Sequence, residues 1–341
     1  MTVRQFLPQF IFWLVSLSIV HHYTKEKCLS SSLAKKSEND IMWYKKEKMH
    51  AGKVYNRETP ILFIGGMPRS GTTLMRSMMD AHPKMRCGEE TRLVPRLLGM
   101  RSNWYKSEKE ANRLEEAGVT RDVVDSAVAE FLLEIIVKHG KPAERLCNKD
   151  PFTLKSTKYL TELFPNSRFI LMLRDGRASA HSIISREVTI SGFDITSYRD
   201  VITKWNKAVE GMYYQCKEVG PKYCLPVHYE DLVLHPRPTL KKILEFADLE
   251  WNENVMEHEK HMDDISLSAV EKSTDQVVKP LYTDSLKSWV GHIPDDVMAD
   301  LPKIAPMMKT LGYDVHSKDP HYGKPDQEVQ DKYDAWLKTQ K

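Results

Sequence analysis

The 341-residue sequence lacks several features that would assign it to a class at once. Its net charge is only +3, from 50 basic and 47 acidic side chains, so the charge gives no reason to expect nucleic acid as a partner. It has no internal repeat and no Asn-x-Ser/Thr sequon, so glycosylation lends no support to a secretory location. An apolar content of 41% is ordinary for a globular protein and suffices for one large α/β core or two smaller ones.

A long hydrophobic run is also missing. The one compact apolar stretch, residues 6–20, would span roughly 22 Å as a helix, against ~30 Å for an average hydrocarbon core. A secretory signal peptide is one interpretation, but no small-residue cleavage site follows. A short signal-anchor over residues 6–23, after a cytoplasmic tail of residues 1–5, fits better, although the flanking basic residues do not settle its orientation. The polar residues 24–58 are interpreted as a stem.

Cysteine is scarce, with five in the whole chain. Cys28 lies near the apolar stretch, and the other four are Cys87, Cys147, Cys216 and Cys224. An even number in the body of the chain favours pairing in an oxidising compartment, and four cysteines allow three connectivities.

What the sequence does contain is concentrated in residues 60–90. The apolar run Ile61 to Ile64 is bounded by glycines and predicts a buried parallel strand. A glycine-containing loop follows, and then a helical stretch, Leu74 to Ala81, that ends before Pro83. Strand, loop and helix in this order direct backbone N–H groups and a helix N-terminus at an anion.

The loop has the glycine spacing of a phosphate-binding P-loop but lacks its lysine, because Thr72 stands at that position. A kinase would need the lysine and a magnesium ion held partly by an aspartate, and no apolar strand ends in an obvious lone aspartate. A sulfuryl group carries less charge than a γ-phosphate and would not need the metal, since Arg69 could stabilise it directly. The alternative is a structural turn with no ligand, which would not need the hydroxyl groups of Ser70, Thr72 and Thr73.

The remaining pattern alternates strands with helices. Strands are predicted at residues 144–149, 168–174 and 223–229, the last at an edge because it contains Pro226. Helices are predicted at residues 107–140, from 178 onward and at 231–247. This order predicts an α/β fold over residues 59–315, a P-loop-like parallel sheet with helices on both faces, followed by a polar C-terminal tail at residues 316–341.

Two further basic groups suggest anionic ligands. Arg174 ends a predicted strand, and the next helix presents Ser182 and Arg186 on one face, which could hold a second phosphate or could be a capping cluster. Residues 84–106 hold six basic side chains against two acidic ones, typical of a solvated surface or of a site for an acidic substrate.

Several segments together resemble the tyrosylprotein sulfotransferases, from about Thr59 to Tyr313. They are Pro68-Arg-Ser-Gly-Thr-Thr73, Cys87-Gly-Glu-Glu-Thr-Arg-Leu-Val-Pro-Arg-Leu97, Cys147-Asn-Lys-Asp-Pro151, Leu173-Arg-Asp-Gly-Arg177, Tyr229-Glu-Asp-Leu232 and Lys272-Ser-Thr-Asp-Gln-Val-Val-Lys-Pro280. The resemblance implies the sulfotransferase fold, the donor 3′-phosphoadenosine 5′-phosphosulfate (PAPS), no metal, and acidic tyrosine-containing proteins as acceptors. It also implies a type II Golgi membrane protein with a lumenal catalytic domain, which forms a homodimer.

The resemblance further implies residue roles. The catalytic residues would be Glu90 as general base with Arg69, Lys149 and Ser273 as stabilisers of the transition state. The donor would contact Arg69, Ser70, Gly71, Thr72, Thr73, Arg174, Ser182, Arg186, Tyr229, Ser273, Thr274, Asp275, Gln276, Val277, Val278, Lys279, Pro280, Leu281, Tyr282 and Lys287. The peptide groove would use Arg92, Leu93, Val94, Pro95, Arg96 and Leu97. The disulfides would be Cys87–Cys147 and Cys216–Cys224. One departure lies near Lys287, where Ser288 separates the lysine from Trp289.

The assignment of a carboxylate base is physically reasonable, because a tyrosine hydroxyl with a pKa of roughly 10 is a weak nucleophile at neutral pH. Glu89 and Glu90 are adjacent, and on an extended segment only one can face the sulfuryl group; the residues alone do not choose between them. Three other functions stay open at this point: a PAPS-dependent glycan sulfotransferase, a P-loop kinase, and a non-enzymatic scaffold with a vestigial nucleotide site.

Overall fold

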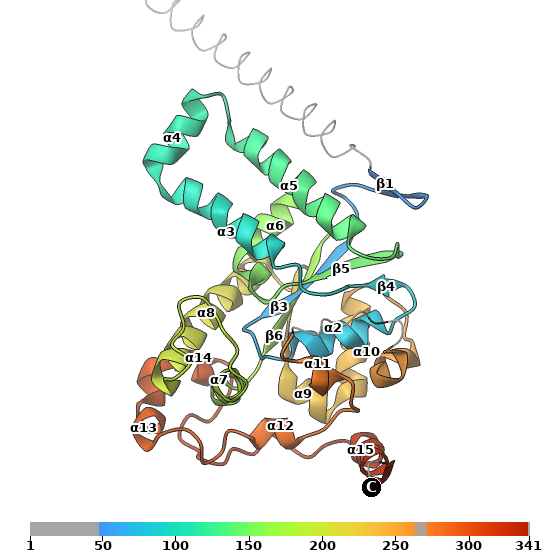
Figure 1. The fold of residues 1–341 in the computed structure, drawn as a ribbon, viewed down its shortest axis with the longest axis vertical. Helices are drawn as coiled ribbons and strands as arrows, with labels where there is room; N and C mark the ends of the chain where they lie inside the picture. Colours follow the sequence, from blue (N-terminus) through green and yellow to red (C-terminus); the bar gives the residue numbers. More distant parts are fainter. Residues whose placement is uncertain (1–47, 263–264, 266–270, 340–341) are drawn as a thin grey trace, which may run out of the picture. The chain divides into compact units, whose positions relative to one another are not determined.

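A five-stranded sheet lies at the centre of the computed structural model, which describes residues 48–262, 265 and 271–339. The strand order is β4-β5-β3-β6-β7, and every neighbouring pair is parallel (Figure 1). The strands are β3 (Ile61–Gly66), β4 (Met85–Arg86), β5 (Arg145–Lys149), β6 (Arg168–Leu173) and β7 (Cys224–His228). The short strands β1 (Lys48–His50) and β2 (Lys53–Tyr55) form a separate two-stranded sheet.

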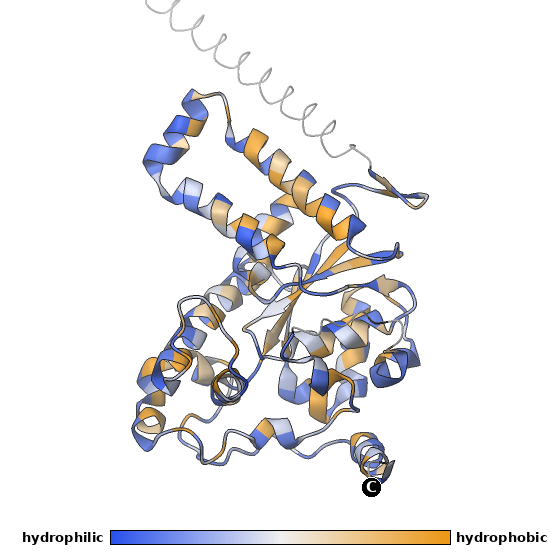
Figure 2. Ribbon diagram, viewed as in Figure 1, coloured by the Kyte–Doolittle hydropathy of each residue, from blue (hydrophilic) through white to orange (hydrophobic). Residues whose placement is uncertain are grey.

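The central strands β3 and β6 are buried and consist of apolar runs, as expected of strands that are covered on both faces of a sheet (Figure 2). Leu62 and Ile64 pack on one face with helices α2, α9 and α10. On the other face Phe63 stacks on Phe169, with ring centroids 5.2 Å apart. Long helix α8 contacts β6 and β7. The predicted parallel sheet with helices on both faces is therefore confirmed.

In the part of the chain that the structure describes, the helices follow in chain order, with three 3-10 turns among them. The first half contains α2 (Thr72–Asp80), α3 (Leu93–Lys106), α4 (Glu108–Glu116), α5 (Arg121–Lys138), η2 (Pro151–Ser156), α6 (Thr157–Leu163), α7 (Gly176–Ser185) and α8 (Tyr198–Val219). The second half contains α9 (Tyr229–Leu234), α10 (Pro236–Phe246), η3 (Glu253–Met256), η4 (His258–His261), α11 (Thr274–Val277), α12 (Asp284–Lys287), α13 (Asp295–Ile304), α14 (Pro306–Thr310) and α15 (Gln327–Thr339).

The strand register brings distant residues to one edge. Ile64 of β3 is paired with Lys149 at the end of β5, and Gly66 is paired with Met172 of β6, two residues before Arg174. The carboxyl ends of these strands therefore meet around the loop that follows β3, which is where open parallel sheets bind ligands.

Two predicted helices are broken in the structure. The expected helix 107–140 is two helices, because the chain reverses at Gly118, whose φ is +76°. The Val119 amide donates back to the Leu114 carbonyl there, as in a Schellman C-cap. The expected helix 231–247 breaks at His235, since the residue before Pro236 is disfavoured in the helical conformation. The predicted edge position of β7 is confirmed.

The expected polar tail after His316 is folded rather than loose. It carries α15, and its Tyr322 hydroxyl donates to Asp175 Oδ2 at 2.8 Å. The predicted anchor and all of the stem before Lys48 lie outside the described residues. Among the residues that the structure describes, no helix has the length and apolar character needed to cross a bilayer.

Candidate active site

The loop between β3 and α2 is shaped for an anion. Arg69 and Gly71 both have left-handed backbone conformations, with φ of 71° and 96°. No side chain caps the start of α2, so the first N–H groups of this helix are not satisfied by a capping residue. A Cβ atom on Gly71 would lie 2.4 Å from the Tyr229 ring, so glycine allows the loop to approach that ring.

Arg69 links the loop to the segment that begins at Ser273. Its Nε donates to Ser182 Oγ at 2.9 Å, and its other nitrogens donate to the Lys272 carbonyl at 3.2 Å and to the side chains of Ser273 and Gln276. Burial, followed by the charges of Arg174 and Arg186, lowers the pKa of Arg69 to about 10. A buried arginine that is repelled by two others is stabilised by an anion.

Arg174 leaves the end of β6 beside the same loop. Its guanidinium donates to the Arg69 carbonyl at 2.8 Å and to the Ser285 carbonyl at 2.6 Å, and its Cζ lies 4.4 Å from the centroid of the Tyr229 ring. Arg186 is one-third exposed and pairs with Asp275 at 2.9 Å. Among the described residues, Ser70 Oγ and Arg174 Nε are buried polar atoms with no hydrogen-bond partner in the protein, as expected of groups that a ligand would satisfy.

A buried acidic network supports the end of β6. Glu230 accepts hydrogen bonds from the Asp175 amide at 3.0 Å and from the Tyr313 hydroxyl at 2.9 Å. Burial raises the pKa of Glu230 to about 7. Because Asp175 also accepts from Tyr322, the C-terminal segment helps to hold the strand end that carries Arg174.

A second cluster forms where β5 ends. The Lys149 side chain is fully buried, and its Nζ lies 2.8 Å from Glu90 Oε1, 3.1 Å from Glu271 Oε2 and 3.4 Å from Thr73 Oγ1. Glu89 turns away toward His139, whose Nε2 lies 3.6 Å from Glu89 Oε2. The structure thus distinguishes two carboxylates that the sequence left equivalent, because only Glu90 reaches the lysine.

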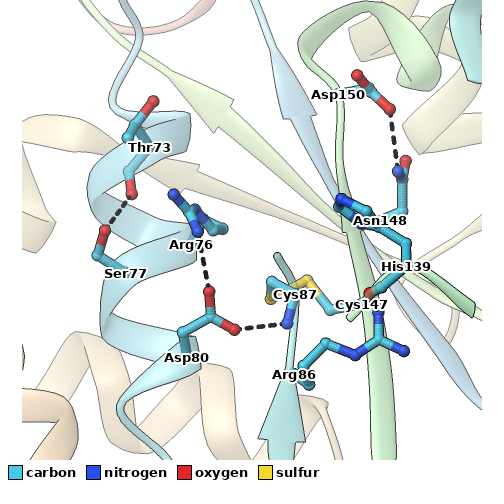
Figure 3. Close-up of a disulfide and its surroundings, with 10 residues drawn as sticks. All are labelled: Thr73, Arg76, Ser77, Asp80, Arg86, Cys87, His139, Cys147, Asn148 and Asp150. Atoms are coloured by element: carbon cyan, nitrogen blue, oxygen red, sulfur yellow. Dashed lines mark hydrogen bonds and ion pairs between the residues drawn. A yellow bond between two sulfur atoms is a disulfide. The ribbon is translucent and has the colours of Figure 1, made fainter. Parts of the chain in front are cut away.

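The segment around Glu90 is held on both sides. Before it, the Cys87–Cys147 disulfide joins the end of β4 to β5 (Figure 3), which confirms one expected pairing; the other, Cys216–Cys224, is present as well. The Cys87 amide donates to Asp80, which in turn pairs with Arg76 of α2. After Glu90, the Asp150 carboxylate accepts from the Arg92 amide at 2.7 Å and from the Thr91 hydroxyl at 2.6 Å.

One pocket lies beside these parts; Glu90 and Lys149 do not line it, but Lys149 lies 3.4 Å from the hydroxyl of Thr73, which does. Its lining comes from the anion loop, Arg174, α9 and the segment that begins at Ser273. The lining residues are Arg69, Gly71, Thr72, Thr73, Leu74, Arg174, Tyr229, Val233, Ser273, Gln276, Val277, Lys279, Pro280, Leu281 and Tyr282. Lys287 is not among them, and its ammonium pairs with Asp319 at 2.6 Å. The described residues contain no group of three or more histidine, cysteine or acidic side chains placed to hold a metal ion.

The expected peptide groove lies at the start of α3. Arg92 is exposed, and its Nε lies 3.8 Å from Glu90 Oε2. Leu93 and Arg96 are exposed, whereas Val94 is fully buried and presents no side chain to a ligand. Basic side chains therefore lie at the surface beside the carboxylate cluster.

Sequence reasoning missed Glu271 and Asp150. Glu271 directly precedes the segment Lys272 to Pro280 that the resemblance singled out, but nothing in its own pattern indicates a buried partner. Asp150 lies within the quoted segment Cys147 to Pro151, and its role as an acceptor for the chain after Glu90 depends on tertiary contacts. Only the fold brings these carboxylates to Lys149 and Thr91.

A family profile and two solved structures indicate the general class of the protein. Residues 60–253 match the profile described as the sulfotransferase family. The fold is shared with the sulfotransferase domain from the curacin biosynthetic pathway, with a TM-score of 0.54 at 17% identity, over 75% of this chain and 98% of that chain. A sulfotransferase domain from the Synechococcus PCC 7002 olefin synthase gives a TM-score of 0.50 at 20% identity, over 78% of this chain and 99% of that chain. Fold and anion loop thus define a sulfotransferase.

Relatives with higher sequence identity show which family of sulfotransferases the chain belongs to. The chain is 59% identical over 82% of its length to protein-tyrosine sulfotransferase 1 of Danio rerio, and 59% identical over 81% to protein-tyrosine sulfotransferase 1 of Homo sapiens. It is 58% identical over 81% of its length to the protein-tyrosine sulfotransferase of Drosophila melanogaster. The alignments cover 79%, 75% and 56% of those proteins, respectively. The chain belongs to the protein-tyrosine sulfotransferase family.

Proposed function

We propose that the protein transfers the sulfuryl group of PAPS to the hydroxyl of tyrosine residues in acidic stretches of other proteins. One structural observation supports this activity in addition to the family membership. Arg69, Lys149 and Glu90, which come from three distant segments, meet at the carboxyl edge of the sheet beside one pocket. A cation for the donor group, a buried ammonium and a carboxylate are the parts that sulfuryl transfer to a phenol requires.

The residues present fit the donor. The loop from Arg69 to Thr73 would hold the 5′-phosphosulfate on its backbone N–H groups, and Ser70 Oγ is a buried hydroxyl with no protein partner. Arg174, Ser182 and Arg186 would hold the 3′-phosphate, and Tyr229 with residues 273–282 would enclose the nucleotide. PAPS supplies an activated sulfuryl group whose leaving group is a phosphate.

The proposed step needs a proton acceptor, because the tyrosine hydroxyl has a pKa of roughly 10 in water. As the phenol oxygen forms its bond to sulfur, the bond between sulfur and the 5′-phosphate oxygen breaks, and the phenol proton passes to Glu90. Lys149 and Ser273, with Arg69, would stabilise the oxygens that gain negative charge during in-line transfer. Each of these side chains is already held by hydrogen bonds at this edge of the sheet.

Acceptor choice is proposed to depend on Arg92 and Arg96. Both are basic side chains at the start of α3, and Arg92 lies beside Glu90. Acidic residues around a target tyrosine would pair with them, and salt would weaken the attraction because the site is exposed.

We also propose that the protein acts in the Golgi lumen as a homodimer held to the membrane by its N-terminal segment. The two disulfides support an oxidising compartment, in which such bonds persist. Expression of the full chain with localisation by microscopy and measurement of its mass in detergent would test the membrane location and the dimer.

The acceptor assay tests the function directly. Purified protein is offered labelled PAPS without metal, together with an acidic tyrosine peptide, the matching phenylalanine peptide, or an oligosaccharide. We expect label only in the tyrosine peptide. Label in the oligosaccharide alone would indicate a glycan sulfotransferase, and binding of ATP with magnesium in preference to 3′-phosphoadenosine 5′-phosphate (PAP) would indicate a kinase.

A further inference from the structure

We propose that Glu271 is a positioning residue of the transfer site. Its carboxylate is the permanent counterion of Lys149 and holds the backbone of Glu90 in place. This inference rests on the proposed function, since it concerns how Glu90 and Lys149 work in that reaction.

The geometry places Glu271 between both groups. Its Oε2 lies 3.1 Å from Lys149 Nζ, and its Oε1 accepts a hydrogen bond from the backbone N–H of Glu90 at 3.2 Å. The side chain of Glu271 is 7% exposed and that of Lys149 is not exposed at all. One carboxylate therefore holds the lysine with one oxygen and the chain of the base with the other.

Two carboxylates share a single ammonium here. Burial alone would raise the pKa of the Glu271 carboxyl, but the charge of Lys149 and the hydrogen bond from the Glu90 amide outweigh it and hold that pKa below its usual range, so Glu271 stays ionised. The two carboxylates thus place two negative charges against one buried ammonium. The charged groups that face the pair are Lys149, Arg76, Arg92 and Asp150.

The role of Glu271 becomes important while the sulfuryl group is transferred. Before reaction, Lys149 is balanced by Glu90 and Glu271 together. Once Glu90 has accepted the phenol proton it is neutral, and without Glu271 the buried ammonium would have no carboxylate partner among the groups it contacts. Glu271 therefore maintains the charge and position of Lys149 on both sides of the step.

Glu271 also connects the base to the donor. It stands two residues before Ser273, whose hydroxyl accepts from Arg69 and which begins the segment that lines the donor pocket up to Tyr282. The stretch of chain that forms this pocket wall is thus preceded directly by the counterion of Lys149 and the acceptor for the Glu90 amide.

The test compares Glu271→Gln with Glu271→Ala and the control Glu89→Gln in the full-length protein. Glutamine keeps an oxygen that can accept from the Glu90 amide but removes the charge and the oxygen that accepts from Lys149, whereas alanine removes all of these. Glu89 is adjacent to Glu90 but faces His139, so its substitution changes charge nearby without touching Lys149. The readouts are PAP binding by calorimetry, and kcat and KM with a tyrosine peptide.

For Glu271→Gln we expect PAP affinity and the KM for the peptide within threefold of the wild type, and a fall in kcat of about 10–10²-fold, because Lys149 and the Glu90 backbone lose part of their shared partner while the donor pocket is unchanged. Glu271→Ala should lose more activity, and Glu89→Gln should match the wild type. Wild-type kcat in Glu271→Gln would overturn the inference, as would a loss of PAP affinity as large as the loss of kcat. A wild type that labels no tyrosine peptide would instead overturn the proposed function.

Discussion

Buried charge is the main feature of this site at the scale of single residues. Lys149 is fully buried, and Arg69 is only 9% exposed. Removing such groups from water costs several kcal/mol unless partners compensate. Lys149 obtains its compensation from two carboxylates and Arg69 from hydroxyl, amide and carbonyl oxygens, so each is held in one position before any ligand arrives.

Substitution of Gly71 tests the close approach of the anion loop to Tyr229. Gly71→Ala places a Cβ 2.4 Å from the Tyr229 ring on a backbone with φ +96°, and the left-handed conformation alone costs about 1–3 kcal/mol. We expect a lower melting temperature and a loss of PAP affinity of at least tenfold, measured by thermal unfolding and calorimetry.

Gly211→Ala is the matched control. Gly211 lies inside α8, and a Cβ added there would meet no atom within 4 Å beyond the backbone of its own helix. Alanine should therefore stabilise the helix by about 0.5–1 kcal/mol and leave PAP binding unchanged. If the two variants bound PAP equally well, the close approach of the loop to Tyr229 would have no functional meaning.

Residue-level prediction from sequence succeeded where the chemistry is local. The glycines and hydroxyls of residues 66–73 predict an anion loop because strand, loop and helix are contiguous. The choice between Glu89 and Glu90 could not be made from residues alone, since it depends on where Lys149 and His139 lie. Glu271 was missed for the same reason, because its partners are more than 120 residues away in the chain.

At the scale of elements, the segment from β4 to α3 is the part that the disulfide constrains. Cys87 precedes Glu90 by three residues, and Cys147 precedes Lys149 by two, so the Cys87–Cys147 bond ties the segment of Glu90 to that of Lys149. The Cys216–Cys224 bond instead joins α8 to β7, away from Glu90 in the sheet order.

The two disulfides should contribute differently to the stability of the protein and to its turnover of the peptide. Chain-entropy arithmetic for sequence separations of 60 and 8 gives about 4 and about 2.5 kcal/mol. We expect Cys87→Ala/Cys147→Ala to lower the free energy of unfolding more than Cys216→Ala/Cys224→Ala, and only the first pair to lower kcat. Urea unfolding and peptide turnover measure both effects, and equal losses of kcat would contradict the proposed constraint on the base.

Some strands and helices could be predicted from the sequence and others could not, for physical reasons. The strands of the sheet are short apolar runs with glycine or charged ends, so residues 61–66, 145–149 and 168–173 were found. The break at Gly118 was missed because the apolar spacing that predicted the helix lies entirely after it, in residues 123–136, whereas α4 is mostly polar and has no buried residue (Figure 2). Helix α3 was not predicted, since its apolar and basic residues were interpreted only as a ligand surface.

At the scale of the whole molecule, the parallel sheet explains why the site exists. The loop after β3 and the ends of β5 and β6, which lie up to 105 residues apart in the chain, meet at one edge because these three strands run side by side in the same direction. The sheet was predictable from alternating strands and helices, but the strand order and register were not, and these decide that Lys149 and Arg174 flank the loop. The C-terminal segment adds Tyr313 and Tyr322 to the support of β6.

We propose that this edge of the sheet transfers a sulfuryl group with Glu90 as the base. The most direct test measures labelling of an acidic tyrosine peptide from PAPS by the wild type, Glu90→Ala and Glu89→Ala, with PAP binding measured for each. We expect Glu89→Ala to transfer like the wild type, and Glu90→Ala to bind PAP normally while losing about 10²–10⁴-fold in kcat. Retained transfer by Glu90→Ala, or its loss in Glu89→Ala instead, would contradict the account.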